Sequence, residues 1–269
     1  MTGENFDRTT GGFADTGQWK LIVFIAPGRI SALLQNTLRP EETPVKVLER
    51  NWEQEEDKLL NNIESAFYDN PGMLDDFATL IIIDTFKSLW IPEEFTDDED
   101  FDPKYFTAVY PAATEDISAD FAGEEVNLYT LTPGLTSFLQ RTMPGCRISS
   151  SHSILKSYFE KETDGEEIFV NISTPFDADL FAFKNGRMLS GTKIEWKELS
   201  DLAYRIILLT QSYGLDRNKV TLKVFAERES AVILEGQLTE LIGNIEIMPL
   251  PQSVIELGAP LAASVAAAK

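Results

Sequence analysis

Short apolar runs separated by polar segments predict an alternation of strands and helices in the first half of the chain. The expected elements are, in order, strands at 19–25, 30–35 and 45–48, a helix at 53–68 and a strand at 79–84. The last strand is a continuous apolar run, which is typical of a central strand covered on both faces. Further on, a strand is expected at 126–131 and helices at 133–142 and 153–162.

The second half of the chain repeats this order. Its expected elements are strands at 168–172, 179–183 and 188–196, a helix at 196–213, a strand at 220–226, a helix at 230–242 and a strand at 245–248. The dipeptide Asn185-Gly186 predicts a tight hairpin, because both residues tolerate positive φ. Each half therefore begins with three antiparallel strands, followed by a helix and a strand.

This order predicts an α/β fold with mixed, α+β-like sheets. Three antiparallel strands, a helix, a strand, a helix and a strand form the ribonuclease-H-like fold, and its tandem duplication is the actin-like ATPase fold. We expect a flexible leader at 1–18, a first half at 19–164, a second half at 165–250 and a tail at 251–269. The alanine-rich tail either frays or forms a helix.

Composition limits the classes of protein. The 269 residues are 43% hydrophobic, which is enough for two packed cores. Because Cys146 and His152 are the sole cysteine and histidine, an intramolecular disulfide and a Cys/His zinc site are excluded. The N-terminal sequence lacks a signal peptide, and no apolar run approaches the ~20 residues of a membrane span. We expect a cytoplasmic protein without a membrane span.

Charge narrows the choice of partners. The net charge of −21 repels phosphate backbones, so nucleic acid is not an expected partner. Between Ile91 and Glu125 the chain has 12 acidic residues and one base, Lys104. We interpret 92–125 as an acidic insertion, either a long connection or an inserted subdomain, without regular structure. It is a solvated surface or a dock for a basic partner protein.

Three segments carry a resemblance to a known family. They are 88–95 (SLWIPEEF), the hairpin 182–189 (AFKNGRML), and 198–205 (ELSDLAYR), which leads into 213–215 (YGL). The chain resembles, from about Trp19 to Leu250, a Bacteroidetes family of uncharacterised proteins with an actin-like ATPase fold. None of these segments is catalytic, so the resemblance implies a fold rather than an activity.

The resemblance also implies a place where ATP chemistry can be checked. Active members of the actin-like superfamily hold ATP between the halves with an Asp-x-Gly hairpin in each half, whose carboxylates act near the metal and whose glycines admit phosphate. Here the first turn is 26–28 (APG), which keeps only the glycine. Ile172 and Thr174 lie near the second expected Asp and Gly. We therefore expect no catalytic residue, no metal and no cofactor.

Five residues remain weak candidates for a site in the cleft between the halves: Gly28, Arg29, Asp84, Thr174 and Asp177. The leading hypothesis is a noncatalytic actin-like protein that acts as an interaction or scaffold module, with its partner and oligomeric state open. The alternative is a divergent ATP-binding enzyme, an ATPase or a small-molecule kinase, whose acid is Asp84 or Asp177.

The segment 149–153 (SSSHS) places hydroxyls beside the only imidazole. Neighbours along a chain rarely have the geometry of a nucleophile and its base. We interpret the segment as the polar start of a helix.

Overall fold

The computed structural model describes residues 16–53, 58–97, 100–101, 104–111 and 116–268. Most of the predicted leader lies outside these ranges, and its last residues, Thr16–Gln18, form one 3-10 turn. Among the described residues, no helix is both long and apolar enough to cross a bilayer.

The first half is built on a five-stranded mixed sheet with the order β10-β4-β1-β2-β3. Its strands are β1 (Trp19–Ala26), β2 (Arg29–Asn36), β3 (Val45–Asn51), β4 (Ala78–Ile83) and β10 (Arg147–Ser150). The first three pair antiparallel, and β4 and β10 continue the sheet in parallel.

The second half repeats this topology in a sheet with the order β13-β12-β11-β14-β15. Its strands are β11 (Glu166–Thr174), β12 (Asp177–Lys184), β13 (Arg187–Glu195), β14 (Thr221–Phe225) and β15 (Asn244–Ile247). Again three strands pair antiparallel and two follow in parallel. The mixed α/β fold predicted from the hydrophobic pattern is confirmed.

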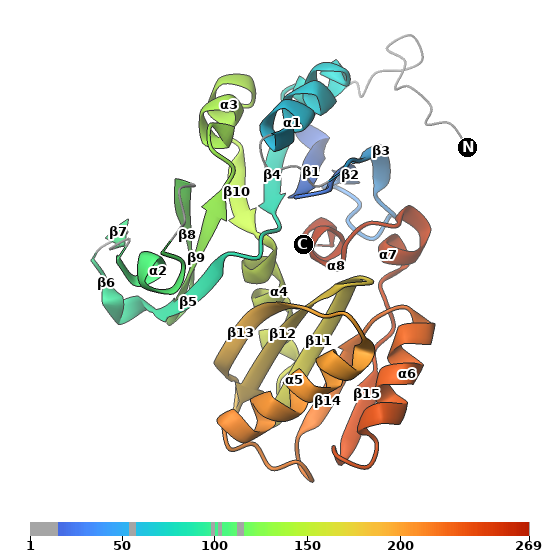
Figure 1. The fold of residues 1–269 in the computed structure, drawn as a ribbon. Helices are drawn as coiled ribbons and strands as arrows, with labels where there is room; N and C mark the ends of the chain where they lie inside the picture. Colours follow the sequence, from blue (N-terminus) through green and yellow to red (C-terminus); the bar gives the residue numbers. More distant parts are fainter. Residues whose placement is uncertain (1–15, 54–57, 98–99, 102–103, 112–115, 269) are drawn as a thin grey trace.

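Helices cover both sheets and fill the space between them (Figure 1). They are α1 (Leu59–Tyr68), α3 (Leu135–Thr142), α4 (Ser151–Phe159), α5 (Leu199–Ser212), α6 (Arg228–Leu238), α7 (Gln252–Leu257) and α8 (Leu261–Ala267). The outer face of the first sheet packs on α1 and α3, and that of the second packs on α5 and α6. The inner faces share one core with α4 and α8.

This shared core joins the halves through apolar contacts. Ile22 and Phe24 of β1 belong to the same buried cluster as Phe169 and Phe181 of the second sheet. Phe159 of α4 stacks on Phe169 with ring centroids 4.6 Å apart. Burial of one such side chain stabilises the fold by about 1.5–3 kcal/mol. The two sheets therefore pack against one shared hydrophobic core.

The alanine-rich tail forms the helix that was one of its two expected outcomes. All seven residues of α8 are buried, which is possible because alanine lets a helix approach both sheets closely. Lys20 donates a hydrogen bond from Nζ to the carbonyl of Ala266, 3.0 Å away, at the negative end of the helix dipole.

Where the structure describes the acidic stretch, most of it is regular, and the expectation of an insertion at 92–125 without regular structure is wrong. It contributes to a three-stranded sheet with the order β5-β9-β8 and carries a short helix and a small two-stranded ribbon. Their bounds are β5 (Ser88–Pro92), β6 (Thr96–Asp97), β7 (Asp100–Phe101), α2 (Lys104–Val109), β8 (Asp116–Ala122) and β9 (Glu125–Leu131). These elements form an arm beside the first sheet (Figure 1).

A small core explains why the arm is ordered. Phe106 is buried with Ile91, Val126 and Leu128, and Ile117 packs against this group. Alternate residues of the three strands are apolar and meet on one face of the small sheet, namely Leu89, Ile91, Ile117, Ala119, Val126 and Leu128. The high density of acidic residues hid this alternation.

Two glycines have defined roles. Asn185 and Gly186 have φ of 52° and 76°, which confirms the predicted hairpin turn between β12 and β13. Gly191 of β13 lies against Trp90 of the arm: a Cβ there would be 2.7 Å from Trp90 Nε1 and 2.9 Å from Phe181 Cε1. The arm therefore contacts the second half where β13 has no side chain.

We predict that Gly191→Ala destabilises the protein by about 1–3 kcal/mol, because the indole must move away from β13. Gly236→Ala is the matched control. It lies inside α6, where a Cβ meets no atom within 4 Å, and we expect it to stabilise by about 0.5–1 kcal/mol. Urea unfolding measures both. A Gly191→Ala variant as stable as the wild type would contradict the close contact.

Candidate functional site

A group of buried charged side chains lies where the two halves meet. Asp84 directly follows β4 of the first sheet, and Asp177 and Asp179 lie on β12 of the second. Lys193 comes from β13, in register with Asp179. The alternation of side chains along β12 places its two aspartates on one face, toward Asp84.

The ammonium of Lys193 is the centre of this group. Its Nζ is 3.0 Å from Asp84 Oδ1 and 3.4 Å from both Asp177 Oδ1 and Asp179 Oδ1. The side chain of Lys193 is 1% exposed and that of Asp84 is 15% exposed. A single buried cation therefore serves three carboxylates and bridges the two halves. We call these four residues the Lys193 cluster.

The carboxylates are also saturated with neutral donors. Ser151 Oγ donates to Asp84 Oδ1 at 2.6 Å, and Asn171 Nδ2 donates to Asp179 Oδ2 at 2.8 Å. Asp177 accepts from Ser173 Oγ at 2.8 Å and from Thr174 Oγ1.

This saturation leaves little room for a divalent cation. Within the described residues, no group of three or more His, Cys, Asp or Glu side chains is arranged to hold a metal ion. A metal would have to displace the Lys193 ammonium, so the cluster does not fit the metal-dependent ATP site that the actin-like fold implies.

Protonation states follow from the same contacts. Burial alone would lower the pKa of Lys193, but Asp179, Asp84 and Asp177 raise it well above its usual value. Burial would raise the pKa of Asp179, yet Lys193 and the hydrogen bond from His152 lower it well below its usual value. Lys193 and Asp179 are therefore both ionised at neutral pH.

A row of hydrogen bonds continues from Asp179 into the first half. His152 Nε2 is 3.0 Å from Asp179 Oδ1, and His152 Nδ1 is 3.3 Å from Ser88 Oγ. This order has the form of a Ser-His-Asp triad. However, Ser88 Oγ donates to Asn127 Oδ1 at 2.6 Å, so its proton is directed away from the imidazole. A nucleophilic serine donates its hydrogen bond to its base, and here the shorter contact of Ser88 is with the amide of Asn127.

The serine segment also starts a helix, as interpreted from its sequence. Ser150 is the N-cap of α4, and its side chain accepts from the backbone N–H of Ser153 at 3.0 Å. The same turn places His152, which is 1% exposed, against Asp179. The interpretation identified the cap but missed the role of the imidazole.

Of the five candidate residues, the structure brings three together. Asp84 and Asp177 share Lys193, and Thr174 donates to Asp177. Gly28 and Arg29 do not contact the Lys193 cluster in this way; they form hydrogen bonds with Trp52, Glu49 and Gly258.

The first hairpin turn is held by hydrogen bonds to residues elsewhere in the chain. The backbone N–H of Trp52 donates to the carbonyl of Gly28 at 3.0 Å, and its indole donates to that of Pro27 at 2.7 Å. Arg29 binds Glu49 Oε1 at 3.1 Å and the carbonyl of Gly258, just before α8, at 2.5 Å.

The candidates from the sequence omitted Lys193 and Asp179. Counting back from the Asn185-Gly186 turn in regular register pairs Asp179 with Thr192. A β-bulge at Ala182/Phe183 shifts the register by one residue and places Lys193 opposite Asp179. The available signal was Asp177-Ala-Asp179, two like charges on one face of a buried strand.

We predict that Lys193→Met destabilises the protein by about 3–5 kcal/mol at pH 7, because three buried carboxylates lose their cation. Without the ammonium, the carboxylates of the variant protonate more readily. Its stability should therefore rise as the pH falls from 7 toward 5. In the wild type the pKa of Asp179 is lowered, so the stability that Asp179 contributes is constant over this range and is lost only as the pH falls below about 4, the pKa of an aspartate in the unfolded chain.

Urea unfolding at both pH values measures this difference. Lys197→Met removes the same charge from an exposed position nearby and should change stability by less than about 0.5 kcal/mol. A loss at Lys193 that is equally small, or independent of pH, would contradict the ionised cluster.

Two solved structures resemble the fold of this chain. A crystal structure of a Bacteroides thetaiotaomicron protein with an actin-like ATPase fold and unknown function matches with a TM-score of 0.77 and 16% identity, covering 89% of this chain and 94% of that one. The PilM-PilN type IV pilus biogenesis complex contains a chain that matches with a TM-score of 0.50 and 10% identity, covering 94% of this chain and 98% of that one.

These likenesses establish the actin-like ATPase fold. No curated protein sequence matches the chain. A family model described as "Protein of unknown function (DUF3822)" matches residues 13–245, so the chain belongs to the DUF3822 family.

Proposed function

We propose that this protein is a noncatalytic interaction module on an actin-like fold, with a cleft held closed by its own side chains instead of by a nucleotide. The observation that carries the proposal is the Lys193 ammonium, 3.0 Å from Asp84 and 3.4 Å from Asp177. These two aspartates are the carboxylates on which metal-assisted chemistry in the cleft would depend, and both are already paired with one buried lysine.

The first hairpin supports the same conclusion. Phosphate binding there requires free backbone N–H groups that the phosphate can approach. Pro27 has no N–H, and the side chain of Arg29, the one cation of this turn, is already bound by Glu49 and by the carbonyl of Gly258. The turn is therefore a structural joint between β3, the tail and the sheet.

The partner that fits best is a basic protein surface. The arm holds most of the acidic residues of 92–125, and Glu93, Glu94 and Glu124 are exposed. Acidic and basic surfaces steer association and select partners. We further propose that 19–164 and 165–250 are the two structural units, and that the protein acts in the cytoplasm, where a lone Cys146 stays reduced.

A nucleotide titration tests the proposal. We expect millimolar ATP with Mg²⁺ to leave the midpoint of thermal unfolding unchanged. The test is sensitive, because a ligand present at its Kd would already stabilise the folded protein by ~0.4 kcal/mol. Phosphate release should not exceed that of a blank, and Asp84→Asn and Asp177→Asn should behave like the wild type in this assay.

The opposite outcome identifies the alternative function. If ATP stabilises the protein only with Mg²⁺, and if hydrolysis or phosphotransfer disappears in Asp84→Asn or Asp177→Asn, the protein is a divergent ATP-binding enzyme. In that case the Lys193 cluster opens in solution.

A further inference from the structure

We propose that the groove between β5 and β13 binds an extended, basic segment of a partner protein, which pairs with the free edges of these strands. The proposal rests on the function proposed above and specifies its binding surface. It follows from three features: the position of the groove between two sheet edges, unpaired backbone groups on both walls, and acidic residues at its rim.

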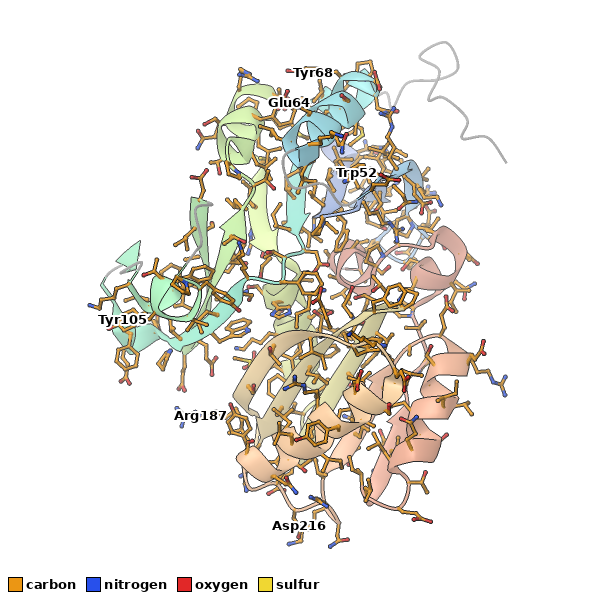
Figure 2. All side chains as sticks on the ribbon, viewed as in Figure 1. Trp52, Glu64, Tyr68, Tyr105, Arg187 and Asp216 are labelled. Carbon is orange, nitrogen blue, oxygen red and sulfur yellow. The ribbon has the colours of Figure 1, made fainter. Side chains whose placement is uncertain are left out.

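The groove is a cavity of about 450 Å³ between the arm and the second half. Its two long walls are β5 and the part of β13 from Arg187 to Thr192, and Tyr110 and Tyr213 also line it. Arg187 marks its outer end, where β13 begins beneath the arm (Figure 2). At ~3.3 Å per residue, a wall of five residues accommodates a segment of about five residues.

The wall formed by β5 is the edge of its sheet. The carbonyl of Lys87 accepts from the N–H of Thr130, and the N–H of Glu93 donates to the carbonyl of Glu124. The backbone N–H and C=O groups of the odd-numbered residues between them therefore point toward β9. The backbone groups of Ser88 and Trp90 therefore point toward the groove. The hydroxyl of Tyr110 donates to the carbonyl of Ser88. The N–H of Ser88 and the N–H and C=O of Trp90 can therefore pair with a ligand.

The opposite wall, β13, is the edge of the second sheet. The backbone N–H of Trp196 donates to the carbonyl of Phe176, so the N–H and C=O groups of the even-numbered residues from Ser190 to Ile194 point toward β12. Those of Gly191 point the other way, toward the groove. The edge of the first sheet at β10 is partly capped instead, because the N–H of Ser150 donates to Asp120 at 2.7 Å. The groove thus offers donors and acceptors on both sides, as strand addition requires.

Side chains in the groove add specificity. The indole Nε1 of Trp90 is buried and, within the described residues, has no hydrogen-bond partner. Tyr213 and Val109 are 43% and 53% exposed and offer apolar contacts to alternate side chains of an extended segment.

Charge at the rim selects a basic segment. Glu124 lines the groove and its side chain is 82% exposed, whereas the neighbouring Glu125 is paired with Lys156 at 3.0 Å. Glu93 and Glu94 follow directly after β5 and are exposed. Arg187, 4.0 Å from Glu124, is the one base among the residues that line the groove. Lysine or arginine side chains of the segment would be attracted to these carboxylates.

The test uses a fluorescent hexapeptide of alternating lysine and valine, and fluorescence anisotropy at low salt measures its binding to the full chain. We expect saturable binding that weakens about tenfold in Glu124→Lys. Glu240→Lys makes the same charge change at an exposed site after α6 and should leave the affinity unchanged. A peptide with glutamate in place of lysine should not bind.

Two further readouts test strand pairing rather than charge alone. A hexapeptide with alternate amides N-methylated keeps its charge but loses donors, and we expect it to bind at least tenfold more weakly. Amide exchange followed by NMR should slow at Trp90 or Gly191 when the parent peptide binds, and should stay unchanged at Ile245 of the distant edge strand β15.

The proposal is overturned if the parent peptide does not bind at millimolar concentration, if Glu124→Lys has no effect, or if the N-methylated peptide binds equally well. Those results leave the absence of nucleotide chemistry untouched, because the ATP titration tests it separately. ATP turnover together with peptide binding would instead overturn the noncatalytic function and keep the groove.

Discussion

The buried ammonium of Lys193 sets the arrangement on which the rest of the structure depends. One positive charge on a side chain that is 1% exposed pairs with carboxylates that come from both halves. Each carboxylate alone would be costly to bury, so the two halves must approach until Asp84 reaches Lys193. The cation that an actin-like cleft would take from solution is here supplied by the chain.

Apolar packing makes this approach possible. The inner faces of both sheets close on α4 and α8, and the small residues of α8 let the sheets come near each other. Arg29 and Lys20 attach the tail to the first sheet through the carbonyls of Gly258 and Ala266. The interior between the sheets is therefore filled by the chain itself.

The hydrophobic pattern predicted the duplicated sheets, because buried strands and the Asn185-Gly186 turn leave strong local signals. It predicted one strand of the arm, at 126–131, but not the others, whose short apolar segments lie among many acidic residues. Nor did it identify the Lys193–Asp179 pair. That pair depends on a one-residue bulge at Ala182/Phe183, a long-range detail that counting from a turn does not reveal. Asp84 and Asp177 were found because they lie at the ends of predicted strands.

The central claim is that a charged lysine, and not a nucleotide, holds the cleft together. NMR of the lysine side-chain ammonium groups tests it directly. The account predicts one Lys193 ammonium signal that is protected from exchange with water, is absent in Lys193→Met, and does not change when millimolar ATP and Mg²⁺ are added. Loss or displacement of that signal on addition of ATP and Mg²⁺ would contradict the account.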